Sequence, residues 1–292
     1  MLQNILFIGA TGMLGKPVAK ILVEQGFEVT AMVRNPEKAA KVLPDDIALL
    51  QGDLSDFKTI ERAIVGHDAI YLNLSVNPND TKKAFHTEKQ GLSNLLLALK
   101  HSGIQRIFYL SSLLQFYQTD WWVLQMKKEA LKKLIRSGIP ITVFYPSTFM
   151  ETLDQKLLVG NYIILIGQSK HPMYWIAAED YAVQVANAIK LGDLHSENME
   201  FTIQGREAYT LQEAAHIFKK YTNKNLKVIT LPWLLMKPLR FLHPQLAYGV
   251  QLSNALNNYQ EQFNAAETWE LLGQPEVSLE SYAKNQDANW QS

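Results

Sequence analysis

The chain has 292 residues and a mass of 33.2 kDa, which is long enough for one large α/β domain and a smaller appendage. Its 28 basic and 28 acidic side chains cancel, so the basic excess typical of nucleic-acid binders is missing and we expect no direct nucleic-acid partner. No cysteine is present, which excludes disulfides, thiolate catalysis and zinc–cysteine sites and fits a reducing compartment.

The sequence shows no targeting or membrane-spanning signal. Residues 1–4 lead directly into an apolar strand pattern, without the basic stretch, apolar core and cleavage site of a signal peptide. The most apolar later stretch, residues 229–236, contains Pro232 and stops at Lys237, far short of the roughly 20 apolar residues that a spanning helix needs. We therefore expect a cytoplasmic protein with no membrane partner.

Strand and helix patterns alternate through the first half of the chain. Residues 5–8 form a short apolar run that ends at Gly9, as expected of a strand buried on both faces. A helix pattern with Pro17 in its first turn follows and ends at Gly26. Further strand patterns lie at 28–33, 47–50, 69–72, 107–110 and 141–144, with helix patterns at 57–65, 88–101 and 122–136. This alternation predicts a Rossmann-type, doubly wound parallel sheet with right-handed crossovers.

The alternation of strand and helix patterns becomes less regular after Pro146. Strand patterns occur at 174–176 and 200–203, and Thr210 with Glu213 forms a capping box that predicts a helix start. We expect the apolar residues 231–242 to pack on the sheet domain. The chain is thus divided into an NAD(P)-binding Rossmann domain (1–150) and a smaller C-terminal α/β substrate subdomain (151–292). Segments near 171–180 and 200–205 are expected to return to the main fold.

A glycine-rich loop joins the first strand to the first helix. Glycines in such a loop let backbone N–H groups approach a diphosphate, and the helix N-terminus adds partial positive charge. The alternative is a tight turn whose glycines serve packing alone, but the loop stands at the expected junction of a complete alternating half. The expected cofactor-binding residues here are Gly9, Thr11, Gly12, Met13, Leu14 and Gly15.

The end of the second strand bears on the choice of cofactor. An NAD-selective site usually has an acidic residue there, but residues 32–34 contain none. Arg34 could hold a 2′-phosphate with its planar guanidinium, and Lys38 would add charge. The alternative for Arg34 is a solvated side chain in a loop. We expect NADP(H) as the cofactor, with NAD(H) bound less tightly.

Several motifs together resemble a known family. The likeness covers roughly the first 215 residues in order. It is to the atypical short-chain dehydrogenase/reductase superfamily, and most closely to its NmrA-like NAD(P)-binding branch. The motifs that carry it lie at residues 9–15, 33–36, 52–56, 110–112, 137–142, 146–151 and 178–182.

The resemblance implies further cofactor contacts. Asp53 and Leu54 would border the adenine, although Asp53 could instead cap the next helix. Residues 73–75 would line the middle of the cofactor. The implied residues beyond the glycine loop are Asp53, Leu54, Asn73, Leu74, Ser75, Ser111, Ser112, Pro146 and Phe149, the last four on the nicotinamide side.

The chain departs from the family at the usual tyrosine–lysine pair. In family reductases the lysine holds the nicotinamide ribose and lowers the pKa of a tyrosine that protonates the substrate. The family spacing places the lysine at Lys127, but Val123 then occupies the tyrosine position. Tyr117 lies before the expected helix. Lys127 could instead belong to a solvated, lysine-rich helix face. Lys127 and Ser112 are the expected catalytic residues.

Other site types find little support. The seven histidines form no metal spacing, so we expect no metal. Five aromatic residues could wall an apolar substrate pocket, although plain core is the commoner role. They are Trp121, Trp122, Phe149, Tyr174 and Trp175.

Three functions remain open. The first is an NADPH-dependent oxidoreductase that reduces a small conjugated acceptor such as a quinone without a tyrosine acid. The second is a non-catalytic NADP(H) redox sensor that acts through a protein partner. The third is an assembly factor that uses bound NADPH structurally. A homodimer is also left open.

Overall fold

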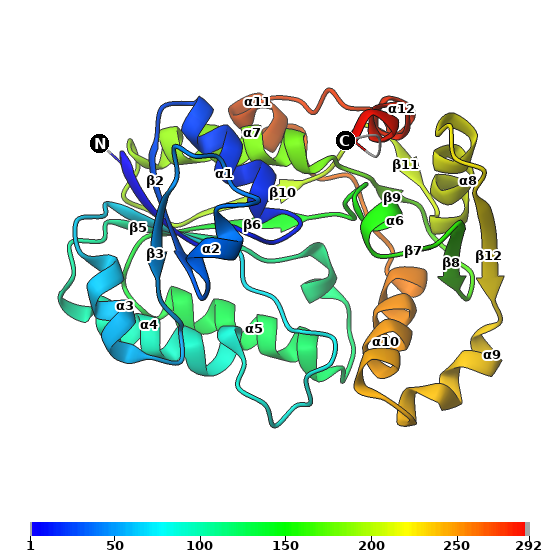
Figure 1. The fold of residues 1–292 in the computed structure, drawn as a ribbon, viewed down its shortest axis with the longest axis horizontal. Coiled ribbons are helices and arrows are strands. Elements are labelled where there is room, and N and C mark those ends of the chain that lie inside the picture. Colours follow the sequence, from blue (N-terminus) through cyan, green and yellow to red (C-terminus); the bar gives the residue numbers. More distant parts are fainter. Residues whose placement is uncertain (1, 290–292) are drawn as a thin grey trace.

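Seven parallel strands form the central sheet of the computed structural model, which describes residues 2–289 (Figure 1). The strand order is β10-β6-β5-β4-β1-β2-β3, so the order reverses between β1 and β4. This arrangement confirms the predicted Rossmann-type fold. The strands are β1 (Asn4–Ile8), β2 (Glu28–Val33), β3 (Ala48–Gln51), β4 (Ala69–Leu72), β5 (Arg106–Leu110), β6 (Ile141–Pro146) and β10 (Met199–Ile203).

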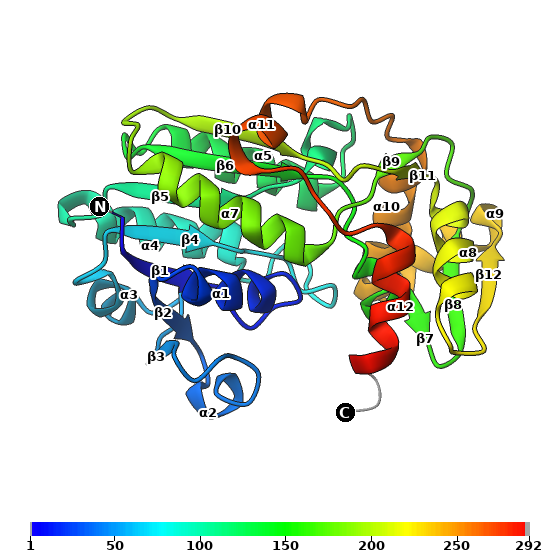
Figure 2. The ribbon, with the colours of Figure 1, turned by 90° about the horizontal axis from the view of Figure 1, so that it is seen from above.

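Helices cover both faces of the sheet, which is why its inner strands are buried along their whole length and mostly apolar. The first layer contains α1 (Gly15–Glu24), α7 (Ala178–Gly192) and α11 (Ala266–Leu272), and Figure 2 shows α7 lying beside α1. The opposite layer contains α3 (Phe57–Ile64), α4 (Leu92–Ala98) and α5 (Trp122–Ile135). Each layer packs over its own set of buried side chains.

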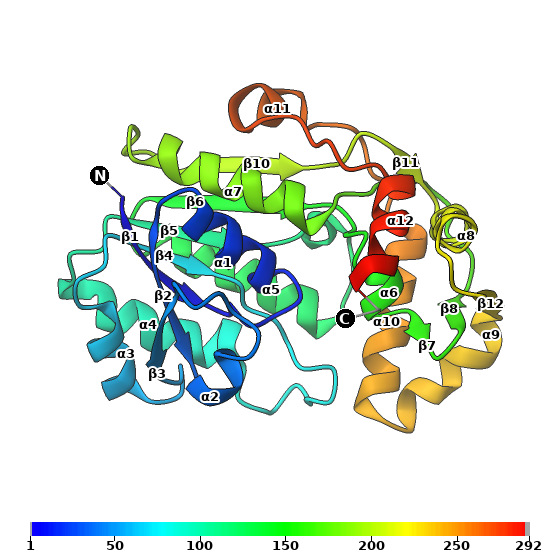
Figure 3. The same ribbon diagram turned by 45° about the horizontal axis from the view of Figure 1, so that its top comes forward.

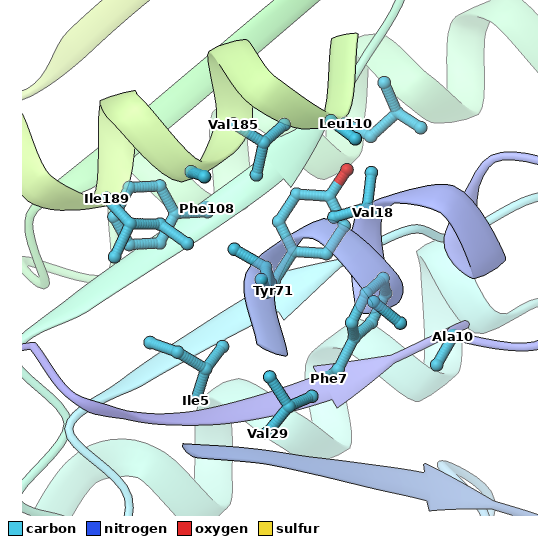
Figure 4. Close-up of a cluster of buried hydrophobic side chains, with 14 of the residues drawn as sticks. Ile5, Phe7, Ala10, Val18, Val29, Tyr71, Phe108, Leu110, Val185 and Ile189 are labelled. Carbon is cyan, nitrogen blue, oxygen red and sulfur yellow. The ribbon is translucent and has the colours of Figure 1, made fainter. Parts of the chain in front are cut away.

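The core beneath α1 and α7 is built around buried aromatic rings (Figure 4). The ring of Phe7 meets that of Tyr71 edge-on, with centroids 4.6 Å apart. The hydroxyls of Tyr71 and Tyr181 lie 2.7 Å apart, so each polar atom is satisfied inside the core. This contact ties β4 to α7, although 110 residues separate the two tyrosines.

A smaller lobe follows the carboxyl ends of the strands (Figure 3). Its three-stranded sheet has the order β12-β8-β7, and a two-stranded sheet pairs β11 with β9. One apolar cluster holds these strands to their helices. The elements are α6 (Thr152–Gln155), β7 (Leu158–Val159), β8 (Tyr162–Ile166), β9 (Met173–Tyr174), β11 (Ala208–Tyr209), α8 (Leu211–Tyr221), β12 (Lys227–Leu231), α9 (Trp233–Met236), α10 (Pro244–Asn258) and α12 (Leu279–Asn289).

The predicted helix at 88–101 is divided in the structure. A π-helical turn (Thr87–Gly91) precedes α4, and a 3₁₀ turn (Leu99–His101) follows it. The strand expected at 200–203 is β10, which pairs with β6, and the capping box at Thr210 is present. Strands β7, β8, β11 and β12 were not predicted; β7 and β11 have only two residues each, and β12 ends at Leu231, where the run that we assigned to core packing begins.

The expectation that residues 231–242 pack on the sheet domain is wrong. Neither α9 nor the following 3₁₀ helix (Lys237–Phe241) contains a buried residue. Apolar composition indicates burial only when another element covers the segment. Among residues 2–289, no helix is both long and apolar enough to cross a bilayer.

Candidate dinucleotide site

The glycine loop lies where the strand order reverses, at the carboxyl ends of β1 and β4. Gly9 has a φ of +95°, and a Cβ there would lie 2.2 Å from the backbone oxygen of Asn73. A Cβ at Gly15 would lie 2.2 Å from the oxygen of Gly9. Both positions therefore require glycine for the fold itself, because the loop folds tightly onto α1 and onto the segment after β4.

Gly12 differs from the other two glycines. A Cβ there would be no closer than 3.4 Å to any protein atom, so packing does not demand glycine. Gly12 and Thr11 are exposed at the loop tip, while Met13 and Leu14 are half-buried. The open space at Gly12 is what a backbone needs to approach a bound diphosphate closely.

The N-terminus of α1 is free to receive an anion. Leu14 occupies the N-cap position and makes no side-chain cap, and the first turn holds no acidic residue. The N–H groups of the first turn and the helix dipole therefore keep their preference for negative charge. The loop and helix end fit the diphosphate of a dinucleotide.

A surface pocket of about 460 Å³ lies at the carboxyl ends of β2 and β3, at the same edge of the sheet as the glycine loop. Arg34 and Asp53 both line it, so the structure brings these two predicted residues together. Arg62 of α3 also lines it, and no motif in the sequence identified this arginine. Lys38 is not among the lining residues; its backbone N–H is bound by Asn35, which caps the short helix α2 (Pro36–Ala39).

The alternative for Asp53, a helix cap, does not hold. Asp56 is the N-cap of α3, where its carboxylate accepts a hydrogen bond of 3.0 Å from the Lys58 N–H. Asp53 accepts instead from the Ser55 N–H at 2.7 Å, which fixes the turn at the pocket wall. The neighbouring Leu54 is a buried core residue.

Residues 73–75 form the other wall of the loop. The Asn73 N–H donates to the Ile8 oxygen at 2.9 Å, and its side-chain amide lies 3.4 Å from the Gly9 oxygen. Leu74 is buried and Ser75 is exposed. Asn73 therefore holds the loop after β1 against the segment after β4, at the place where the strand order reverses.

The two serines after β5 have different hydrogen-bond roles. Ser111 is buried, and its hydroxyl donates to the Gln115 side chain at 3.2 Å. Ser112 caps a 3₁₀ helix (Leu113–Phe116), with its hydroxyl oxygen accepting from the Leu114 N–H at 3.2 Å. Ser112 keeps its own proton available to donate, because a capping hydroxyl uses only an oxygen lone pair.

Lys127 lies in a buried ion pair that the sequence did not reveal. Its Nζ is 2.6 Å from Oε1 of Glu88, and the two side chains are 15% and 0% exposed. Glu88 belongs to the π-helical turn, a feature common at functional sites. The alternative of a solvated lysine face therefore fails for Lys127.

Tyr109 completes this cluster. Its hydroxyl donates to the same Glu88 oxygen at 2.9 Å, and the Lys127 Nζ lies 5.7 Å from the centre of its ring. Oε2 of Glu88 is buried without a hydrogen-bond partner among the described residues. Burial, and then the Glu88 charge, raise the pKa of the Tyr109 hydroxyl well above its ordinary value.

No hydroxyl stands at the usual acid position on α5. Val123 lies one turn before Lys127 and is buried. Tyr117 follows the 3₁₀ helix, and its ring is 6.5 Å from that of Tyr259. The helix therefore offers the lysine of the family pair without its proton donor.

Pro146 ends β6, and the segment after it contacts the C-terminal part of the chain. Phe149 is buried with its ring 5.4 Å from that of Tyr181. Ser147 donates to Glu261 at 2.7 Å, and Gln204 donates to the other oxygen of that carboxyl at 2.7 Å. Burial raises the pKa of Glu261 to about 7 despite these two hydrogen bonds. The sequence held no signal for this long-range contact.

We expect Glu261 to make stability depend on pH. An unfolded glutamate titrates near pH 4.3, so between about pH 4.3 and 7 the folded state holds a proton that the unfolded state has released. The free energy of unfolding therefore falls as the pH rises through this window. In the Glu261→Gln variant, the decrease in the free energy of unfolding between pH 5 and 8 should be smaller than in the wild type by up to roughly 3 kcal/mol.

Urea unfolding at each pH measures this effect. Glu151 is also buried with a raised pKa, and it remains in both proteins, so its contribution cancels. Glu24→Gln, on the surface of α1, is the control. Parallel pH profiles for Glu261→Gln and the wild type would contradict the prediction.

Four of the five aromatic residues named from the sequence fall into two groups, and the fifth, Tyr174, is half-buried with its ring 5.3 Å from that of Phe263. Trp175 and Phe149 are core residues. Trp121 and Trp122 line a pocket of about 820 Å³ between the start of α5, the segment after β4 and the α9–α10 region. Among residues 2–289, no group of three His, Asp or Glu side chains is placed to hold a metal ion.

Comparison with known proteins agrees with the family resemblance of the motifs. The model of the NmrA-like family matches residues 1–283. Photosystem II assembly factor Ycf39 of Trieres chinensis is 24% identical over 259 residues, which are 87% of this chain and 80% of that protein. Quinone oxidoreductase 2 of Escherichia coli is 26% identical over 228 residues, 76% of each chain.

Solved structures show the same fold. NADPH-dependent quinone oxidoreductase QOR2 of Escherichia coli, complexed with NADPH, has a TM-score of 0.74 and 22% identity, covering 97% of this chain and 99% of that one. The resemblance inferred from the motifs is therefore confirmed.

Proposed function

The chain belongs to the NmrA-like family, and on this premise we propose that it binds NADPH and reduces a small conjugated acceptor such as a quinone. The observation that carries the proposal is the glycine loop, in which Gly9 and Gly15 are required by the fold while Gly12 leaves open space beside an uncapped helix N-terminus. Quinone oxidoreductase 2 of Escherichia coli, found both as a relative and as a solved complex with NADPH, supports the substrate class.

Different residues would bind different parts of the cofactor. Gly12 and the first turn of α1 would hold the diphosphate, and Arg34 with Arg62 would hold a 2′-phosphate. Ser112 and Lys127 would meet the nicotinamide ribose. The Glu88 carboxylate, 2.6 Å from the Lys127 Nζ, keeps that side chain in place. When bound, NADPH supplies a hydride to the acceptor.

The protein residues explain why a quinone suits this site. Val123 cannot donate a proton, and the raised pKa of Tyr109 makes its hydroxyl a poor acid at neutral pH. A quinone that accepts a hydride becomes a hydroquinone anion, which water can then protonate. The overall reaction converts quinone, NADPH and a proton into hydroquinone and NADP⁺. Ordinary ketones need a concerted acid, whose loss typically costs about a hundred- to ten-thousand-fold in rate.

The test is NADPH oxidation by the purified protein against a panel of quinones and simple ketones. Turnover with quinones, and at least about a hundredfold less with ketones, is expected. No turnover above background across the panel would reject the enzymatic proposal.

A redox sensor is the second candidate, and the Lys127–Glu88 pair together with Val123 favours it, because the lysine is already engaged and no acid is present. Cofactor binding without turnover, with a protein partner whose affinity differs between NADP⁺ and NADPH, would support it. Equal partner affinity in the two states would reject it. An assembly role with structural NADPH accords with the name of the Ycf39 relative.

Arg34 should determine the preference for the phosphorylated cofactor. We expect Arg34→Ala to weaken NADPH binding about 10- to 100-fold, since hydrogen bonds to charged groups contribute about 1.5–3 kcal/mol. NADH binding should stay the same, because NADH lacks the 2′-phosphate. Calorimetry with both cofactors measures this, with the exposed Arg136→Ala as the matched control. Tighter binding of NADH than NADPH by the wild type would contradict the assignment.

A further inference from the structure

Four large apolar side chains are exposed together where α9 runs into the next 3₁₀ helix. Leu234 and Leu235 are 81% and 66% exposed, and Phe241 and Leu242 are 79% and 73% exposed. We call residues 233–242 the apolar ridge. Neither of its helical segments contains a buried residue, so its apolar side chains do not serve the core. A cluster of this kind usually marks an interaction surface.

The stretch of sequence around the ridge carries charges of one sign. Residues 214–260 contain no aspartate or glutamate, although the whole chain carries 28 acidic residues. Lys237 and Arg240 lie within the ridge itself, and the Arg240 guanidinium is 4.7 Å from the centre of the Phe241 ring. The basic residues of this region are Lys219, Lys220, Lys224, Lys227, Lys237 and Arg240.

The ridge also lies at the margin of the molecule. Figures 1 and 3 show α9 and the start of α10 at the outer edge of the small lobe, away from the parallel sheet. A flat surface could therefore reach it without meeting the glycine loop. Trp233, Phe241 and Leu242 line the same pocket as Trp121 and Trp122, so the ridge borders that aromatic pocket.

We propose that the apolar ridge binds the surface of an anionic lipid bilayer. The leucines and Phe241 would enter the boundary between headgroups and acyl chains, while Lys237 and Arg240 would contact lipid phosphates. Charge favours this occupant, because the ridge combines exposed apolar side chains with basic ones and contains no carboxylate of its own. Asp80 and Asp120 line the adjoining pocket, where Lys82, Lys237 and Arg240 leave an excess of basic side chains. The proposal replaces the expectation of no membrane partner, which considered only spanning segments.

Vesicle co-sedimentation tests the proposal with the full chain and no added ligand. Vesicles of phosphatidylcholine with phosphatidylglycerol should bind the wild type, and vesicles of phosphatidylcholine alone should bind it at least about tenfold more weakly. Lys237→Gln with Arg240→Gln should lose about 25-fold in binding, or roughly fivefold for each charge. Leu235→Asp with Phe241→Asp should lose at least about tenfold.

Leu194→Asp is the matched control, because Leu194 is 77% exposed but lies beyond α7, outside the ridge. It should bind vesicles as the wild type does, and every variant should keep wild-type NADPH affinity, which reports a native fold. The proposal is overturned if the wild type binds neither vesicle, or if the Leu194 and ridge variants lose binding equally. It is also overturned if sedimentation analysis shows a dimer that Leu235→Asp dissociates while vesicles bind no protein, since the ridge would then be a protein interface.

Discussion

Gly12→Ala is expected to fold as the wild type does and to bind NADPH about 10- to 100-fold more weakly, the range expected for losing one charge-assisted hydrogen bond to the diphosphate. The added methyl would meet no protein atom closer than 3.4 Å, so the folded protein can accommodate it. The same methyl would occupy the space through which the loop backbone approaches the diphosphate. Calorimetry and thermal unfolding measure the two effects separately.

Two other glycines provide the controls for this experiment. Gly103→Ala adds a methyl where nothing lies within 4 Å, and it should change neither affinity nor melting temperature appreciably. Gly15→Ala forces a Cβ to 2.2 Å from the Gly9 oxygen and 2.6 Å from the Ala10 oxygen, so it should destabilise the fold as well. Unchanged NADPH affinity in a folded Gly12→Ala protein would remove the loop from the cofactor site.

Lys127→Met should destabilise the protein by about 3–5 kcal/mol, because it leaves the buried Glu88 carboxylate without its cation. Glu88 is fully buried, and one of its oxygens already has no hydrogen-bond partner among the described residues. Urea unfolding measures the loss. Lys132→Met is the matched control, since Lys132 pairs with Glu129 at 2.7 Å where both side chains are exposed, and little change is expected there.

A double variant separates the structural role of this pair from its role at the cofactor. Lys127→Met with Glu88→Gln removes both charges, and a glutamine oxygen can still accept from Tyr109, so most of the stability should return. If Lys127 also contacts the nicotinamide ribose, this stable double variant should still bind NADPH more weakly. Wild-type NADPH affinity in the double variant would confine Lys127 to a structural role. Equal losses for Lys127→Met and Lys132→Met would contradict the buried pair.

Local patterns in the sequence were enough to predict the fold class and the position of the candidate dinucleotide site. Apolar strands alternating with amphipathic helices are local patterns, and a glycine loop at the first strand–helix junction is a local motif, so neither needs tertiary information. Parallel strands in this order place the loop and the segment after β4 at one sheet edge. Arg34 was assigned to the cofactor from the residues at the end of the second strand and Asp53 from the family resemblance, and the two share one pocket.

Tertiary structure alone decided the contacts between residues far apart in the chain. Lys127 meets Glu88 across 39 residues and Ser147 meets Glu261 across 114, and no spacing rule links such pairs. The apolar segment at 231–242 also shows that a local pattern does not predict tertiary contacts. Its composition predicted a buried packing surface, but burial depends on whether another element covers a segment, and none of the described residues covers the ridge fully.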